Sequence, residues 1–149
     1  MTADGMTAVL ERYAQAKNRQ DVEAALAECT DDCFYESVAF GGRVQGKEAL
    51  RAFYTGLFEA LPDYRAEFDG FAFGELTAVA WGRFGGTVEG EFMGAPATGH
   101  RISVPVTFVC TFRDGRISGD TGYFDLATLC EQAGVPMETL RPASRPQAA

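Results

Sequence analysis

The feature that most constrains this chain is a hairpin pattern over residues 102–125, ISVPVTFVCTFRDGRISGDTGYFD. Two runs rich in β-branched and aromatic residues flank Asp114-Gly115, a dipeptide that readily takes the positive φ angles of a tight turn. The turn sets the register of an antiparallel pair, so counting outward from it assigns every residue to one face of the sheet. The pattern therefore predicts a two-stranded antiparallel hairpin.

One face of this hairpin is expected to be apolar and the other wetter. By this count the facing pairs on the apolar side are Phe112 with Ile117, Cys110 with Gly119, Phe108 with Thr121, Val106 with Tyr123 and Val104 with Asp125. The opposite side carries Ser103, Thr107, Thr111, Ser118 and Asp120. The alternation predicts a buried face that ends on the carboxylate of Asp125.

A carboxylate on a buried face costs free energy unless it is hydrogen-bonded or its pKa rises until it holds a proton near neutral pH. Asp125 is therefore a candidate acid or base. It also precedes the helical pattern LATLCEQAG, where an aspartate commonly caps the first turn. The two interpretations are compatible, because one carboxylate oxygen can cap a helix while the other faces a cavity.

Composition places the chain in a broad class. Its 149 residues are 46% hydrophobic, which suits one domain with a core, and its net charge of -8 argues against nucleic-acid or anionic-membrane partners. The start of the sequence does not resemble a signal peptide, and no stretch has membrane-spanning length. A cytoplasmic protein with a small-molecule partner is expected.

Cysteine and histidine usage argues against a metal site. The four cysteines form no CxxC pair, and His100 is the single histidine. Buried, reduced thiols are the expected state, and neither a nucleophile–base spacing nor a Walker, GxSxG or dinucleotide glycine motif occurs. No cofactor is expected.

Helical patterns dominate the first part of the chain. The spacing over residues 6–17 predicts a helix that turns Tyr13 inward, with Lys17 at the same helical spacing. Asp21 is a candidate cap of a second helix, a short strand is expected over 33–38, and a third helix over 47–60.

Strand patterns follow, over residues 64–74 and 76–88. Their interior glycines predict a sheet that curls and encloses a ligand once helices cover it. A short helix after Asp125 completes a single domain over residues 1–137, and residues 138–149 are expected to form a flexible tail.

Two groups of motifs resemble known families. MTAVLERYAQAKNRQDVEAALAECTDDCFYESV followed by GKEALRAFY is similar to the opening of the NTF2-like cone fold, ketosteroid isomerase in particular. GTVEGEFMGAPATG, FRDGRI and FDLATLCEQAG resemble the SnoaL-like polyketide cyclases, and together the matches span residues 6–134. The resemblance implies a conical α+β barrel, with three N-terminal helices packed on a strongly curved mixed sheet around one hydrophobic pocket. It also implies a homodimer formed through the outer sheet face.

The functional residues of the two families can be matched to this sequence one by one, and the matches distinguish two reactions. The isomerases use a tyrosine of the first helix, matched by Tyr13, but their two aspartates fall on Ser37 and Phe108 here. Steroid-type isomerisation thus lacks its proton shuttle. The cyclases use an aspartate before the last helix in an intramolecular aldol closure, and Asp125 matches it. Where that group often has histidines, this chain has Asp120 and Val88.

Further pocket candidates are aromatic, and each has a structural alternative. Tyr13, Tyr54 and Tyr123 could point hydroxyl groups into the pocket or pack in the core with the hydroxyl at its rim. Trp81 could form a pocket wall, although the pattern leaves open which face of the strand carries it. Arg83 is more typical of a sheet surface. The ligand-binding candidates are Tyr13, Ser37, Tyr54, Trp81, Phe108 and Tyr123.

Three functions remain in view. The first is a cofactor-free polyketide cyclase or isomerase-type enzyme that binds a flat, apolar, carbonyl-bearing molecule and uses Asp125 as acid or base. The second is a non-catalytic binding or assembly module, in which phenylalanines fill the cone. The third is an epoxide-type hydrolase, which would need Arg83 or Arg101 and a second carboxylate beside Asp125.

Overall fold

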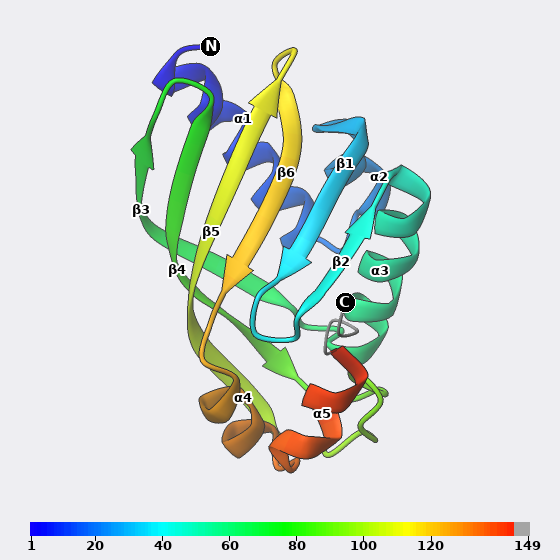
Figure 1. Cartoon of the computed structure of the whole chain (residues 1–149). Helices are drawn as coiled ribbons and strands as arrows, with labels where there is room; N and C mark the ends of the chain where they lie inside the picture. The colour runs from blue at the N-terminus through cyan, green and yellow to red at the C-terminus, as the bar shows by residue number, and fades with distance from the viewer. Residues whose placement is uncertain (145–149) are drawn as a thin grey trace.

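The computed structural model describes residues 1–144 as a single α+β fold (Figure 1). The helices are α1 (Ala3–Asn18), α2 (Val22–Ala27), α3 (Lys47–Ala60), α4 (Leu126–Ala133) and α5 (Met137–Ser144). The strands are β1 (Cys29–Ser37), β2 (Gly42–Gln45), β3 (Arg65–Phe73), β4 (Thr77–Thr87), β5 (Arg101–Arg113) and β6 (Arg116–Tyr123). The predicted class, with three N-terminal helices on a curved mixed sheet, is confirmed.

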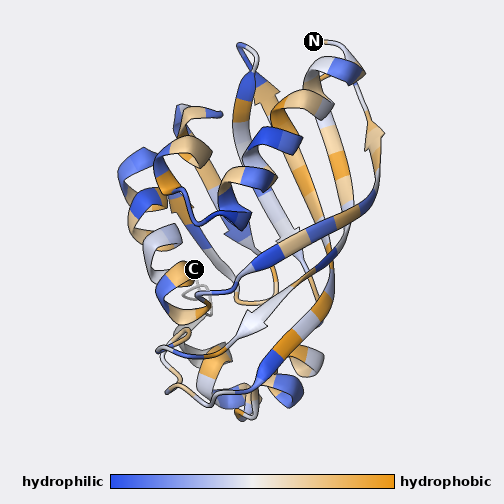
Figure 2. Ribbon diagram, turned by 180° about the vertical axis from the view of Figure 1, so that it is seen from behind, coloured by the Kyte–Doolittle hydropathy of each residue, from blue (hydrophilic) through white to orange (hydrophobic). Residues whose placement is uncertain are grey.

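The sheet has six strands in the order β2-β1-β6-β5-β4-β3. It is mixed because β1 pairs with β6 in parallel while the other neighbours are antiparallel. The barrel implied by the resemblance is corrected, since the order begins at β2 and ends at β3 without closing. Helices α1 and α3 lie on one face of the open sheet, with hydrophilic residues on their outward turns (Figures 1 and 2).

Glycines allow the predicted curl of the sheet. A Cβ atom on Gly82 would lie 1.9 Å from the carbonyl oxygen of Glu67 in β3, and one on Gly85 would lie 2.0 Å from that of Ile102 in β5. Neither approach leaves room for a side chain, so β4 can come this close to both neighbours only with glycine. The curl turns the inner face into the concave wall of a cavity.

Helix boundaries follow local chemistry. The side chain of Asp21 accepts a hydrogen bond from the amide of Ala24, as its predicted role as N-cap of α2 requires. Helix α3 spans the predicted residues 47–60 and buries Leu50, Tyr54 and Phe58 on one stripe. These stripes direct the aromatic side chains of the helices toward the sheet.

The hairpin turn forms as predicted, but the register beyond it does not. Asp114 and Gly115 have φ angles of 54° and 74°, and Phe112 pairs with Ile117. One step further, Thr111 pairs with Gly119, so Ser118 is an extra residue in β6. This β-bulge moves every later side chain of β6 to the opposite face.

The bulge therefore exchanges the predicted environments of three residues. Asp120, assigned to the wetter face, pairs with Cys110 and is 1% exposed. Tyr123 is 46% exposed and Asp125 is exposed, so their predicted placement on the buried face is wrong. A buried carboxylate does lie in this strand, but it belongs to Asp120.

The C-terminal part also differs from expectation. Helix α5 begins at Met137 and buries Leu140 completely, where a flexible tail was expected. The rest of that tail, residues 145–149, lies outside the described residues. All four cysteines are buried free thiols, as predicted. Within the described chain, no helix is long and apolar enough to cross a bilayer.

Candidate ligand-binding site

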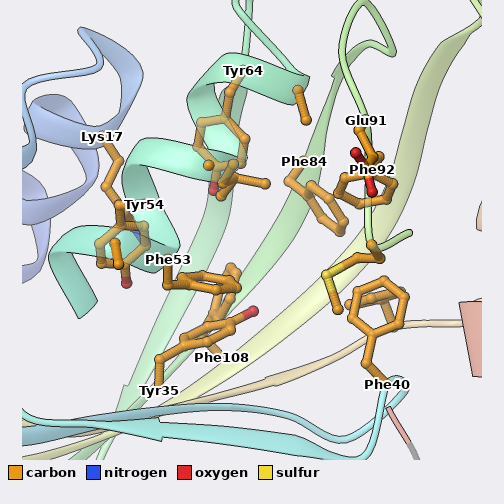
Figure 3. Close-up of a pocket in the computed structure, with 16 residues that line it drawn as sticks. Lys17, Tyr35, Phe40, Phe53, Tyr54, Tyr64, Phe84, Glu91, Phe92 and Phe108 are labelled. Carbon is orange, nitrogen blue, oxygen red and sulfur yellow. The ribbon is translucent and has the colours of Figure 1, made fainter. Parts of the chain in front are cut away.

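A cavity of about 270 Å³ lies between the concave face of the sheet and the helices. Figure 3 shows aromatic side chains pointing into it from both layers. The aromatic rings that line it are Tyr35, Phe40, Phe53, Tyr54, Tyr64, Phe84, Phe92, Phe108 and Phe124. Tyr35 and Phe53 stack with their centroids 4.8 Å apart, so this pair of rings forms part of the apolar lining.

Lys17, from the last turn of α1, is the cation of this aromatic cavity. It is 3% exposed, and its Nζ lies 4.1 Å from the ring centroid of Tyr13 and 5.2 Å from that of Phe108. Among the residues that the structure describes, none accepts a hydrogen bond from Nζ. A buried ammonium with three donors and no acceptor is a binding point for an oxygen atom of a ligand.

Asp120 supplies the counter-charge behind Lys17. Its Oδ2 lies 3.9 Å from Lys17 Nζ and accepts a hydrogen bond of 3.2 Å from the hydroxyl of Tyr13, while Cys110 Sγ lies 3.6 Å from Oδ1. Burial raises the pKa of Asp120, and the Lys17 ammonium and Tyr13 hydroxyl act against that rise. A carboxyl group with a raised pKa can exchange a proton nearer neutral pH.

The Tyr13 hydroxyl is also hydrogen-bonded to the hydroxyl of Tyr54. Tyr54 lines the main cavity, whereas Tyr13 and Asp120 line only a small void of about 10 Å³ behind it. A chain of hydroxyl groups thus connects the buried carboxyl group with the ligand space. Burial raises the pKa of both tyrosines well above the ordinary value, so they remain protonated at neutral pH.

The charge state of Lys17 follows from its neighbours. Burial acts to lower the pKa of Lys17, but the oxygens of Tyr64 and Asp120 outweigh that effect and the pKa is raised. The side chain is therefore an ammonium group at neutral pH. A lysine that forms a Schiff base needs a lowered pKa, so this one is suited to electrostatic stabilisation of a negative oxygen.

Two of the predicted ligand-binding residues, Tyr54 and Phe108, line the cavity. Tyr13 and Ser37 are buried, at 4% and 5% exposure, without lining it. Tyr13 still belongs to the site through its hydrogen bonds to Tyr54 and Asp120. Both helical tyrosines thus lie where the sequence placed them, on inward faces.

The other candidates lie on the outer side of the sheet or at its end. Trp81 is 42% exposed and packs over Gly70, where a Cβ would lie 2.4 Å from its ring, so the pocket-wall interpretation is wrong. Tyr123 lies in the same shallow outer hollow as Trp81. Asp125 caps α4, accepting hydrogen bonds from the Ala127 amide and from Thr128, and these bonds lower its pKa.

The arginines of the hydrolase interpretation are engaged elsewhere. Arg83 donates hydrogen bonds to Ser103, and Arg101 lies 3.9 Å from Asp63. Both arginines are exposed. In the described part of the chain, the Asp125 carboxylate is hydrogen-bonded to Ala127 and Thr128 and to neither of these arginines.

Sequence reasoning missed the charged residues of the site. Lys17 follows Tyr13 by four residues and so lies on the same helix face, a signal that was available. Asp120 carried no such signal, because the bulge that turns it inward leaves no mark in the alternation of β6. Glu91, which lines the exposed end of the cavity, lies in a loop without periodicity.

The open curled sheet, the covering helices and the aromatic cavity between them define the ketosteroid isomerase-like, or NTF2-like, class of fold. The family model of the SnoaL-like polyketide cyclases matches residues 7–133, and the chain belongs to this family. No protein with a curated description matches the sequence.

Solved structures agree on the fold. A protein from Jannaschia Sp. CCS1 assigned to the SnoaL-like polyketide cyclases is 20% identical, with a TM-score of 0.80 over 89% of this chain and 94% of that one. TsrD from Streptomyces laurentii is 23% identical, with a TM-score of 0.79 over 91% and 99%. A hypothetical protein with a ketosteroid isomerase-like fold from Catenulispora acidiphila DSM 44928, solved with trimethylamine, is 17% identical, with a TM-score of 0.76 over 87% of this chain and 95% of that one.

Proposed function

We propose that this protein binds a compact, flat, carbonyl-bearing molecule and polarises its carbonyl group for cofactor-free aldol chemistry. The observation that carries the proposal is the buried Lys17 ammonium, which faces an aromatic cavity without a hydrogen-bond acceptor among the described residues. A ligand oxygen at Nζ would satisfy this donor. The family of polyketide cyclases supports the class of reaction.

The Lys17 ammonium is suited to stabilise the charge that develops on that oxygen. A positive group held in place in a low-dielectric cavity interacts more strongly with a forming oxyanion than water does, and it needs no reorganisation when the charge appears. The rings of Tyr13 and Phe108 hold Nζ from the sides. The polarised carbonyl carbon then becomes a better electrophile.

The hydroxyl chain offers a route for the proton. When Asp120 is protonated, it can donate to Tyr13, which donates to Tyr54, which donates to the ligand oxygen. Each tyrosine passes on one proton and receives one, whereas Asp120 only gives one up, so the net change is an ionised Asp120 beside Lys17 and a neutral hydroxyl group on the ligand. Tyr54 is the member of this chain that lines the cavity.

An aldol closure uses these groups in sequence. A carbon between two carbonyl groups loses its proton to a solvent base, and the resulting enolate carbon forms a bond with the polarised carbonyl carbon. The electron pair of the C=O π bond moves to oxygen, Lys17 stabilises the alkoxide, and the hydroxyl chain protonates it. Solvent then returns a proton to Asp120.

The size of the cavity limits the ligand. Its volume of about 270 Å³ is just below the range of about 300–1,000 Å³ usual for sites that bury drug-sized ligands. The cavity is small partly because six of the twelve phenylalanines of the chain line it: Phe40, Phe53, Phe84, Phe92, Phe108 and Phe124. We therefore propose a monocyclic or bicyclic ligand instead of a large polycyclic one.

The small volume of the cavity also favours a second candidate function, a non-catalytic module that binds such a ligand. Apart from Lys17 and the tyrosines, the inner part of the cavity is lined by apolar groups. An enzyme and a carrier share the oxygen-binding point at Lys17. They differ in whether a bound ketone reacts, so an experiment on reactivity separates them.

Binding is tested with acetophenone and α-methylstyrene, which differ only in a carbonyl oxygen replaced by CH₂. We expect the protein to bind acetophenone more tightly, by calorimetry, and Lys17→Met to abolish the difference. Lys47→Met is the matched control, because Lys47 is the only other lysine and does not line the cavity. Equal affinity of the unmodified protein for both probes would rule out the oxygen site.

Reactivity is tested by hydrogen–deuterium exchange of the acetophenone methyl group in D₂O, followed by NMR. Stabilisation of the enolate oxygen should accelerate the exchange, and Lys17→Met should remove the acceleration. Lys47→Met should retain it. Tight binding without any acceleration would support the carrier function and overturn the catalytic one.

A further inference from the structure

Glu91 lines the cavity at the end opposite to Lys17. Figure 3 shows the two side chains on opposite sides of the aromatic rings. Lys17 is buried whereas Glu91 is exposed, so the cavity runs from an inner cationic end to an outer anionic end. No described residue forms a hydrogen bond or ion pair with the Glu91 carboxylate.

The backbone holds Glu91 at this position. The amides of Glu89 and Gly90 donate to the carbonyl oxygen of Ala60, at 3.0 and 3.2 Å, which ties the loop to the end of α3. A Cβ on Gly90 would lie 2.8 Å from the carbonyl oxygen of Glu59, so only glycine permits this approach. The segment before Glu91 is therefore docked on the helix.

The segment after Glu91 is a tight turn. Phe92 and Ala95 exchange two backbone hydrogen bonds, each 2.9 Å long, around Met93 and Gly94, whose φ angles are 50° and 84°. Phe92 and Ala95 are buried. The backbone of Glu91 thus lies between two anchored points, which places the residue at the mouth of the cavity.

Aromatic rings surround the same end. Phe40 packs edge-on against Phe92 and Phe124, with centroids 6.1 and 5.4 Å apart, and Phe84 packs against Phe124 at 5.2 Å. All four rings line the cavity together with Glu91. A carboxylate beside aromatic rings is the environment that an organic ammonium group prefers, because ring faces and carboxylate both attract positive charge.

We propose that Glu91 and these rings bind a protonated amine at the outer end of the ligand. The inference rests on the proposed function, in which Lys17 binds a carbonyl oxygen at the inner end. The ligand class is then an aromatic or alicyclic amino ketone. The two charged ends also fix its orientation, since an ammonium group at the inner end would face Lys17.

The test uses three compounds that each have one aromatic ring and one ketone group. They are 4-(aminomethyl)acetophenone, which carries an ammonium group, its neutral isostere 4-ethylacetophenone, and the anionic 4-acetylphenylacetate. We expect the ammonium probe to bind roughly tenfold more tightly than the neutral one and the anion to bind most weakly. The preference should fall as salt is added, because the outer end is exposed.

Glu91→Gln should remove the preference for the ammonium probe and leave the affinity for 4-ethylacetophenone unchanged. Glu89→Gln is the matched control. It makes the same charge change two positions before Glu91 in the sequence, at a residue that does not line the cavity. A preference that survives Glu91→Gln, or that Glu89→Gln abolishes equally, overturns the proposal. So does the absence of any preference, or of binding, in the unmodified protein.

Lys17→Met separates this inference from the proposed function. The first ratio, the affinity for the ammonium probe over that for the neutral probe, depends on Glu91. The second ratio, the affinity for acetophenone over that for α-methylstyrene, depends on Lys17. If only the first ratio fails, the oxygen site stands and the amine site does not. If only the second fails, the outer site binds amines without a carbonyl contact at Lys17.

Discussion

Lys17 Nζ lies 3.9 Å from Oδ2 of Asp120, and the two side chains are 4% and 2% exposed. They come from α1 and β6, more than a hundred residues apart in the sequence. A buried pair of this kind adds little net stability, because desolvation offsets the attraction, but loss of one partner leaves the other charge unpaired. The pair is therefore expected to be sensitive to single substitutions.

Asp120→Asn should lower the free energy of unfolding by about 3 kcal/mol, because the Lys17 ammonium would remain buried beside a neutral amide. Adding Lys17→Met should restore most of this loss, since the charge is then gone as well. Urea unfolding of the two single variants and the double variant measures the coupling. Additive effects would show that the two groups do not interact.

The pH dependence of stability should reveal the raised pKa of Asp120. Burial raises the pKa of Asp120 in the folded state above its ordinary value of 3.8, so the folded protein keeps this proton to a higher pH than the unfolded chain. The contribution of this group is present at low pH and is lost as pH rises from 3.8 through the raised pKa. The share of the free energy of unfolding that Asp120 contributes should therefore decline with pH over that interval.

A pair of variants isolates that contribution. Lys17→Met and the double variant Lys17→Met/Asp120→Asn have the same titrating groups except Asp120. Both lack the Lys17 cation, which opposes the rise in the pKa of Asp120. The free energy of unfolding of Lys17→Met relative to the double variant should fall as pH rises from 3.8 through the raised pKa of Asp120, by at most about 1.4 kcal/mol per pH unit. A constant difference would mean that Asp120 titrates normally.

Gly82→Ala should destabilise the fold by about 2 kcal/mol or more, because its methyl group would meet the backbone of β3 at 1.9 Å. Gly56→Ala is the contrasting change. A Cβ on Gly56 meets nothing within 4 Å, so alanine in this helix should stabilise the protein by about 0.5–1 kcal/mol. Thermal unfolding of both variants measures the effects, and similar effects would contradict the role given to Gly82.

Asp125→Ala should lower the melting temperature by a few degrees through loss of the α4 cap, whereas Asp125→Asn should change it little, since asparagine also caps helices. Neither substitution should change acetophenone affinity, because Asp125 does not line the cavity. Reduced affinity in Asp125→Asn, with its stability intact, would return Asp125 to the site.

Much of the site followed from helical periodicity. Tyr13 and Tyr54 lie on the apolar stripes of α1 and α3, and both are at the predicted inner face. Phe108, on the apolar side of β5, lines the cavity as that alternation implied. Such faces depend on spacing along one element, which a sequence shows directly.

The placement of Trp81 could not be read in the same way. Glycines at 82, 85 and 86 interrupt the side-chain pattern that would have shown which face of β4 is buried. In the structure, Ala80 and Gly82 turn inward while Trp81 lies outside over Gly70. In β4, small residues therefore occupy these buried positions and the bulky Trp81 lies on the exposed face, so residue size does not indicate which face is buried.

The sequence by itself determined the local structure: the positive-φ turn at Asp114-Gly115, the caps of α2 and α4, and the apolar stripes of the helices. These depend on interactions within a few residues. Only the tertiary structure decided which carboxylate is buried. The bulge at Ser118 accompanies the packing of the Phe34 ring from β1 over Gly119, where a Cβ would lie 2.4 Å from the ring. That contact joins distant segments, and a shift of one residue in register is enough to bury Asp120 and expose Asp125.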